Sequence, residues 1–327
     1  MLRYVFRRLL MMIPVLLGVT VVIFTLMYII PGDPAVAILG SQAEPWEYEA
    51  LRETMGLNDP YIVRLLRYLA QVYTRFDLGT SYLSGVSITT ELAGRIPHTL
   101  TLGFFSVIVS VFIGIPLGIQ AATHAGTWRD WLPLTISLIG VSMPGFWLAL
   151  MLVLAFSVKL GWLPAYGMGG LKYWVLPVLS GAFGGLANLA KQTRSSMLDV
   201  LYSDYIVMAR AKGMPERDVI YKHALPNALI PIITIMGSTF ARMLGGGMLT
   251  ETIFSIPGVG YYMVKSVNNR DYPAVQGSVL LLSIVFTFVM LLTDIVMAFV
   301  DPRIKAQFAS RAAKDQTKQA KPKGAAA

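Results

Sequence analysis

The chain has 327 residues, of which 55% are hydrophobic and only 14% are charged, and it carries a formal charge of +9. This proportion of apolar surface excludes an ordinary soluble globular protein and favours a membrane protein. Because cysteine is absent, disulfides and thiolate metal sites are excluded, and the redox compartment stays undetermined.

The first membrane-spanning helix is predicted within residues 1–30. This segment begins with basic residues, as secretion signals do, but its apolar run is about twice the usual length of roughly 7 to 15 residues. No cleavage pattern of small residues follows it. We therefore expect an uncleaved first span at residues 9–30.

Residues 31–96 form a predicted external helical cap. The segment opens with Pro-Gly-Asp-Pro, in which two prolines and a glycine end the first helix. Apolar residues recur at helical spacing between Ile62 and Tyr73 and give one apolar face. The eight acidic and five basic residues of this segment leave too small a net charge to identify a ligand.

The remaining core, residues 97–305, contains five more nearly charge-free segments. A helix needs about 20 residues to cross the hydrocarbon layer, and these segments reach or approach that length. We predict an all-α polytopic membrane protein with six transmembrane helices, an external helical insertion and a helical loop at 196–227 on the cytoplasmic side. The five segments are residues 99–122, 132–158, 175–190, 228–250 and 277–300.

Lysine and arginine set the predicted orientation. With the N-terminus in the cytoplasm, the inner segments carry 17 of these residues and the short outer loops carry four, as the bias of cytoplasmic loops toward positive charge requires. Both termini are therefore predicted to be cytoplasmic, and residues 306–327 form a predicted disordered basic tail. The positive net charge suits anionic lipid at the inner face and requires no nucleic acid.

The loop at 196–227 has the pattern of two short helices around a glycine corner. The first helix is predicted to end near Lys212, with Gly213 following in a conformation with positive φ. Pro215 is placed to begin a second helix, which Leu-Pro-Asn-Ala is expected to break before the fifth span. On composition alone this loop is equally well a polar connector that lies on anionic lipid.

The spacing within the loop resembles that of binding-protein-dependent ABC importer permeases, whose pattern is Glu-Ala-Ala, three residues, Gly, nine residues and Ile-x-Leu-Pro. Four positions match it, namely Ala209, Gly213, Leu225 and Pro226, and three depart from it, namely Val207, Met208 and His223. The stretches DYIVMARAKG and HALPNALIP are similar to the dipeptide, oligopeptide and nickel branch, as are PGDP, MGLNDP, FDLGTSY, ETIFSIPGVG and DPRI elsewhere. This order of motifs is similar to the first of the two permease subunits in such systems.

The resemblance implies a subunit that pairs with a second homologous permease in a bacterial or archaeal inner membrane, surrounded by lipid. It also implies two ABC ATPase subunits on the cytoplasmic side and an extracytoplasmic substrate-binding protein that delivers peptide. The chain lacks the G-x-x-x-x-G-K-S/T loop, so it is expected to be no enzyme and to bind no cofactor, with ATP and Mg²⁺ on the partner ATPases. The histidines, at 98, 124 and 223, are too few for a metal cluster.

Within the loop, the resemblance implies a helix that couples the ATPase to the membrane spans. Arg210 and Lys212 are candidates for ion pairs with the ATPase, and lipid head groups are their other predicted partners. The full set of expected coupling residues is Tyr205, Ala209, Arg210, Ala211, Lys212, Gly213, Leu225 and Pro226.

Ionisable residues inside spans are functional hypotheses by default. Arg242 either lines the pathway and meets a peptide carboxylate or reaches the outer head groups, and Asp294 is a packing, inner-interface or pathway residue. These two residues lie at different depths and are not expected to pair. Glu251, in a motif near the family's outer gate, completes the candidate pathway set. The glycines at 245–247 permit either close helix packing or a hinge.

Peptide is the favoured substrate, and a nickel chelate or glutathione carried by the same architecture is the alternative. A secondary transporter would be expected to carry internal repeats and more charges within its spans. A channel would need a filter loop, and an intramembrane enzyme would need a nucleophile with its base. None of these patterns occurs in the sequence, so these classes are disfavoured.

Overall fold

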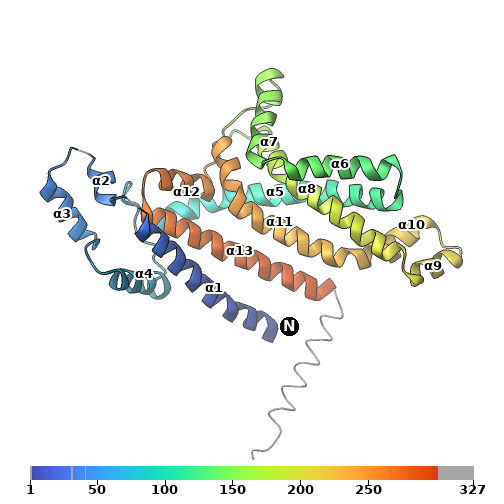
Figure 1. The fold of residues 1–327 in the computed structure, drawn as a ribbon, viewed down its shortest axis with the longest axis horizontal. Coiled ribbons are helices and arrows are strands. Elements are labelled where there is room, and N and C mark those ends of the chain that lie inside the picture. Colours follow the sequence, from blue (N-terminus) through green and yellow to red (C-terminus); the bar gives the residue numbers. More distant parts are fainter. Residues whose placement is uncertain (1, 31, 41, 301–327) are drawn as a thin grey trace, which may run out of the picture.

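The computed structural model describes residues 2–30, 32–40 and 42–300, which fold almost entirely as helices (Figure 1). The segment 306–327, predicted to be a disordered tail, lies outside the described residues. The elements in chain order are α1 (Leu2–Ile29), α2 (Pro34–Leu39), α3 (Pro45–Thr54), α4 (Tyr61–Arg75), α5 (Ile88–Thr123), α6 (Trp128–Ser142), α7 (Gly145–Leu152), η1 (Val153–Lys159), α8 (Leu171–Leu201), α9 (Asp204–Ala211), α10 (Glu216–Asp218), η2 (Val219–Ala224), α11 (Leu225–Ile253), α12 (Val259–Asn268) and α13 (Tyr272–Val300), where η marks a π-helix.

Five helical segments of the described chain are long and apolar enough to cross a membrane, and a sixth arises if a bent pair counts as one span. This confirms the polytopic all-α fold. The prediction of one continuous helix over 132–158 was wrong in form, because α6 and α7 meet at a bend of 104°. Pro144 drives Met143 into an extended conformation and so interrupts the helix. Figure 1 shows α7 standing out from the side of the bundle.

The closest helix pair is α5 with α8, whose backbones approach through small residues on both helices. A Cβ at Gly114 would come within 2.8 Å of the Leu186 carbonyl oxygen, and one at Gly185 within 2.8 Å of the Ser110 hydroxyl. The Ser110 hydroxyl also donates to the Ala182 carbonyl at 2.8 Å. Glycine and serine thus let the two helices touch, as in other membrane interfaces, and the glycine-rich stretch of α8 is a packing surface.

A buried ion pair fixes α6 against α8 at one end of this interface. Arg194 on α8 donates to both carboxylate oxygens of Asp130 on α6, at 2.5 and 2.8 Å. Asp130 is buried and also accepts from the Gly126 amide at 2.9 Å. The bidentate pair and the backbone donor compensate the cost of burying the Asp130 carboxylate. They also hold the loop before α6 in place.

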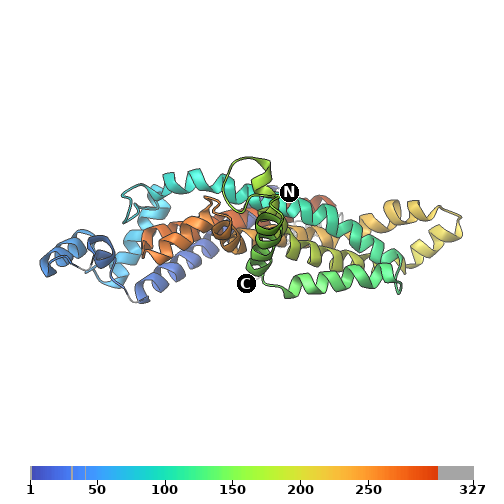
Figure 2. The ribbon, with the colours of Figure 1, turned by 90° about the horizontal axis from the view of Figure 1, so that it is seen from above.

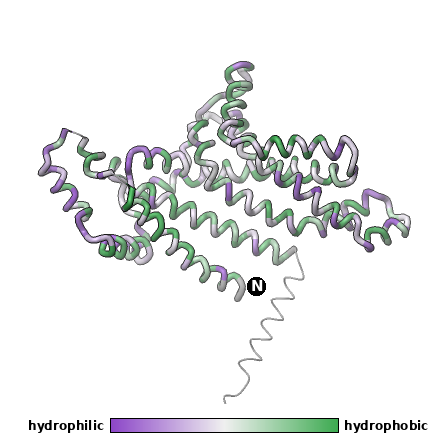
Figure 3. The backbone as a smooth tube through the Cα atoms, in the orientation of Figure 1, coloured by the Kyte–Doolittle hydropathy of each residue, from purple (hydrophilic) through white to green (hydrophobic). Residues whose placement is uncertain are grey.

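Four of the short helices lie at opposite ends of the bundle. Figures 1 and 2 show α9 and α10 at one end and α2 and α3 at the other, and Figure 3 shows that both ends are more hydrophilic than the helices between them. The expected break at Leu-Pro-Asn-Ala is absent, because α10, η2 and α11 follow one another without interruption. Pro226 falls in the first turn of α11, where its missing N–H costs little, and the wider π-turns of η2 precede it.

Near the other end of α11, the side chain of Glu251 ties three segments together. Thr99 on α5 donates to its carboxylate at 2.7 Å, and the amide of Tyr261 on α12 donates to it at 2.9 Å. The Thr99 hydroxyl in turn accepts from the amide of Val259 at 2.9 Å. Glu251 is only 1% exposed, so this buried network fixes the start of α12 against α5 and α11.

Glycine at 258 makes this network possible, because a Cβ there would overlap the Glu251 carboxylate. We predict that Gly258→Ala lowers the free energy of unfolding by about 1 to 3 kcal/mol, the usual cost of overpacking. Gly245→Ala is the matched control, since a Cβ at Gly245 meets nothing within 4 Å. Thermal unfolding of the two purified full-length variants in the same detergent is the measurement, and equal midpoints would contradict the tight fit at Gly258.

Candidate functional site

Helix α9 is held at its end of the bundle by an apolar core. Ile206 and Ala209 point from α9 into this core and are buried. They meet residues from the end of α8, from η2 and from the start of α11, namely Met197, Leu201, Val219, Ala224 and Ala228. Ala209 therefore serves internal packing and does not lie on the outer surface of α9. The core makes α9 a stiff extension of two membrane-spanning helices.

The opposite side of α9 exposes large apolar side chains. Val207 is 55% exposed and Met208 is 60% exposed, and Tyr205 lies beside them on the same helix. Tyr202 and Tyr221 are also exposed on the neighbouring segments. Apolar side chains gathered on a surface beyond the membrane spans are typical of protein–protein contact sites. We call Tyr202, Tyr205, Val207, Met208 and Tyr221 the α9 surface.

The corner after α9 has the predicted glycine conformation. Gly213 has φ of +76°, and its amide donates to the Arg210 carbonyl at 2.9 Å. A Cβ at this position would meet nothing within 4 Å, so the described chain requires glycine here for its backbone angle and not for space. The turn ends α9 abruptly and leaves its outer face clear of the following segment.

The structure pairs Arg210 within the chain. Its guanidinium donates to both carboxylate oxygens of Glu216, at 2.7 and 3.1 Å, and this bond raises the pKa of Arg210. Arg210 thus links α9 to α10 across the glycine corner. Ala211, Lys212 and Pro226 are exposed, and Leu225 packs partly against the α9 core.

One face of α11 is exposed along most of its length and differs from a lipid-facing surface. Its residues recur at helical spacing and are mainly polar or small. By contrast, α13 exposes large apolar residues such as Phe288 and Leu292. Arg242 lies on the exposed face of α11 and donates to the Thr239 hydroxyl at 3.3 Å. The exposed α11 face consists of Pro231, Thr234, Arg242, Gly245 and Leu249.

The structure does not gather the three predicted pathway residues. Asp294 on α13 pairs with Arg8 on α1 at 3.0 Å and so joins the first and last spans. Glu251 is enclosed in the network with Thr99. Only Arg242 of the three lies on an exposed face, and it does not pair with Asp294, as expected from their positions. Among the described residues, no three His, Cys, Asp or Glu side chains form a group that could hold a metal.

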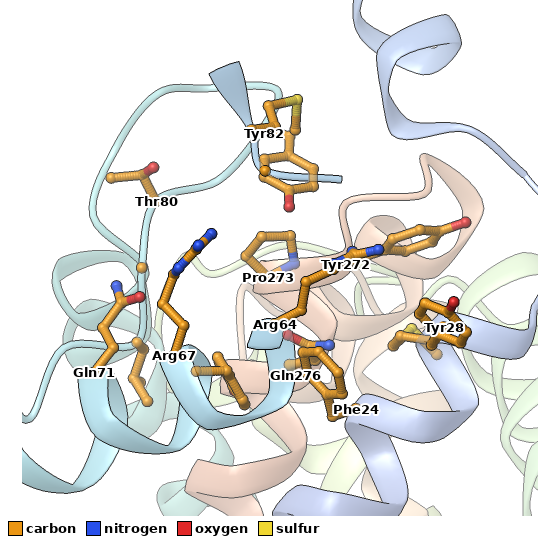
Figure 4. Close-up of a pocket in the computed structure, with 16 residues that line it drawn as sticks. Phe24, Tyr28, Arg64, Arg67, Gln71, Thr80, Tyr82, Tyr272, Pro273 and Gln276 are labelled. Atoms are coloured by element: carbon orange, nitrogen blue, oxygen red, sulfur yellow. The ribbon is translucent and has the colours of Figure 1, made fainter. Parts of the chain in front are cut away.

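A cavity of about 230 Å³ lies at the other end of the molecule, between α1, α4 and the start of α13 (Figure 4). Arg64 and Arg67 reach into it from α4, and none of the described residues that line it is acidic. Burial raises the pKa of Tyr82, which forms part of the wall, and Arg64 opposes that rise. This cavity is not predictable from the sequence pattern, because its walls come from segments far apart in the chain.

Comparison with known proteins identifies the family. Residues 114–306 match the family described as binding-protein-dependent transport system inner membrane component, and residues 1–103 match the N-terminal family of such membrane components. The dipeptide transport system permease protein DppB of Alkalihalophilus pseudofirmus is 42% identical, over 93% of this chain and 100% of the relative. The glutathione transport system permease protein GsiC of Salmonella paratyphi A is 41% identical, over 93% and 99%.

The fold is also shared with a solved transporter. An inward-facing structure of the MetNI methionine ABC transporter has a chain that superposes with a TM-score of 0.56 at 19% identity, covering 64% of this chain and 96% of that one. At this identity the likeness establishes the fold alone. The two family matches and the relatives at about 40% identity show that the chain belongs to the binding-protein-dependent transport system inner membrane components and is a permease subunit of an ABC importer.

Proposed function

We propose that this permease carries short peptides inward, paired with a second homologous permease. A substrate-binding protein delivers the peptide on the outside, and two ATPases bind ATP and Mg²⁺ in the cytoplasm. The named substrate of the 42% identical relative, a dipeptide, supports a peptide substrate. A nickel chelate or glutathione carried by the same architecture is the alternative, and the named substrate of the 41% identical relative, glutathione, supports the second of these.

The α9 surface is the observation that carries the proposed coupling. Its apolar side chains occupy a stiff helix outside the spans, as a docking element for an ATPase groove requires. In our proposal, the ATPases approach each other when they bind ATP and push this helix sideways. Because the α9 core joins both α8 and the continuous segment from α10 to α11, the push reaches two spans together.

The exposed α11 face is the proposed wall of the translocation pathway. A polar and small surface within a span is costly against lipid but suits a water-filled path or a second permease. Arg242 provides a positive charge on that wall, where a peptide carboxylate can accept hydrogen bonds from its guanidinium.

We further propose that both termini and α9 lie on the cytoplasmic side. The pair between Arg8 and Asp294 brings the beginning of α1 to the end of α13. In Figure 1 these helix ends point toward the end of the bundle that carries α9. This arrangement agrees with the excess of lysine and arginine in the loops on that side.

Placing a charge on the α9 surface tests the coupling. We predict that Met208→Glu lowers ATP hydrolysis stimulated by the binding protein, and peptide uptake, by roughly tenfold or more, because an unpaired carboxylate would be buried at the ATPase contact. Met208→Leu, which keeps an apolar side chain of similar size, should retain both activities. The measurement uses proteoliposomes that contain the complete transporter, with assembly checked by co-purification of the ATPases.

If Met208→Glu assembles and transports like the unaltered protein, the α9 surface is no ATPase contact. The polar-connector interpretation of residues 196–227 would then stand, although the family membership would not change.

Arg242→Met tests the pathway. We predict that this variant raises the half-saturation concentration for peptide uptake by roughly tenfold, because it removes a charge-assisted hydrogen bond worth about 1.5 to 3 kcal/mol. The same peptide with an amidated C-terminus is the control, since it lacks the carboxylate. It should be taken up equally poorly by the unaltered protein and by the variant. An unchanged half-saturation concentration, with normal assembly, would remove Arg242 from the pathway.

A further inference from the structure

Helix α4 lies beside the first membrane span and not above it. Tyr73 of α4 shares a hydrogen bond of 2.8 Å with Thr20 of α1, and Tyr61 shares one of 2.7 Å with Thr25. Thr20 lies nine residues before the end of α1 at Ile29, which corresponds to about 14 Å along a helix. Because this stretch belongs to a helix long and apolar enough to cross a membrane, the contact places α4, in the orientation proposed above, at the depth of the outer leaflet.

A second face of α4 exposes apolar side chains at this depth. Ile62 and Leu66 are each 59% exposed, and Val63 lies beside them. The neighbouring helix α1 likewise exposes Val22 and Leu26. A helix with one face on protein, apolar side chains on the next and charges on the third has the pattern of an interfacial helix. The apolar side chains of this second face are suited to contact with lipid acyl chains.

The third face of α4 forms a wall of the 230 Å³ cavity (Figure 4). Arg64 donates to the Leu57 carbonyl at 3.3 Å and lies over the ring of Tyr28 at 5.5 Å, and it forms no ion pair with a carboxylate of the described residues. Arg67 pairs with Asp59 at 2.7 Å, and its side chain is still largely exposed. Among the described residues, Asp59 therefore offsets the charge of Arg67, whereas the guanidinium of Arg64 has no carboxylate as an ion-pair partner.

The lining of the cavity contains a buried hydroxyl group with unused hydrogen-bonding capacity. Tyr68 of α4 lines the cavity, and its hydroxyl group is buried and forms no hydrogen bond with any described residue. A buried hydroxyl without a partner is costly, so a ligand that reaches it would recover that cost. Together with two guanidinium groups, such a donor favours a ligand with anionic oxygens.

We propose that α4 is seated in the outer leaflet and that the cavity binds the phosphate of a phospholipid. Arg67 follows Val63 by one helical turn, so it stands where the apolar face meets the cavity. One lipid molecule can therefore place its phosphate against Arg64 and Arg67 while its acyl chains run over Val63 and Leu66. The contact would anchor the external segment to the membrane surface.

The depth of α4 can be measured with a single fluorescent label, because the chain has no cysteine. In the complete transporter in lipid nanodiscs, an environment-sensitive dye at Leu66→Cys should be quenched strongly by lipids that carry a nitroxide high on the acyl chain. The control is Glu53→Cys on the exposed helix α3, where quenching should be weak. Equal quenching at both sites would overturn the proposal, as would a dye at residue 66 that is shielded from lipid by another protein.

The phosphate site has a separate test. Native mass spectrometry of the complete transporter should show retained phosphatidylglycerol, and Arg64→Gln with Arg67→Gln should reduce that retention several-fold. Arg75→Gln removes a charge from the same helix outside the cavity and should leave it unchanged. Equal retention in all variants would overturn the proposal. Displacement of the lipid by free inorganic phosphate at low concentration would overturn it too, by assigning the cavity to a soluble oxyanion.

Discussion

The close contact between α5 and α8 is the constraint on which the rest of the subunit depends. Two helix backbones touch because glycines on each side leave room, and Ser110 then bonds across the gap. At one end of this pair, α8 continues to Leu201 and carries α9. At the other end, Thr99 of α5 holds Glu251 and thereby α12. Both ends of the molecule are thus built on one rigid pair.

Under the proposed coupling, this rigidity has a mechanical consequence. An interior packed through backbone contacts and buried hydrogen bonds resists gradual deformation, so a push on α9 moves helices as a unit. Two connections transmit the push: α9 packs on the end of α8, and the Arg210–Glu216 pair links it to α10, which continues through η2 into α11. Because Arg242 lies on α11, the same motion reaches the proposed pathway wall.

Hydropathy predicted the spans well because the membrane requires long apolar helices whatever their packing. Gly213 was predictable too, since a positive φ is a local property. The pairing of Arg210 with Glu216 was not, because it crosses a turn whose geometry depends on the α9 core. The two prolines show the same dependence on surroundings. Pro144 interrupts a helix, whereas Pro226 lies in the first turn of α11 within a continuous helical segment, so proline alone does not predict a break.

The cavity beside α4 escaped prediction for a related reason. Hydrophobic periodicity and composition identify an amphipathic helix, but they do not tell which of its faces contacts water, lipid or protein. Helix α4 has three faces: one contacts α1, one lines the cavity and one is exposed. The hydroxyl groups of Tyr61 and Tyr73 identify the face that contacts protein, because each shares a hydrogen bond with a threonine of the mainly apolar helix α1. Under the proposed seating of α4 in the outer leaflet, these long-range hydrogen bonds set the depth of α4 in the membrane, and that depth determines which ligands the external segment can bind.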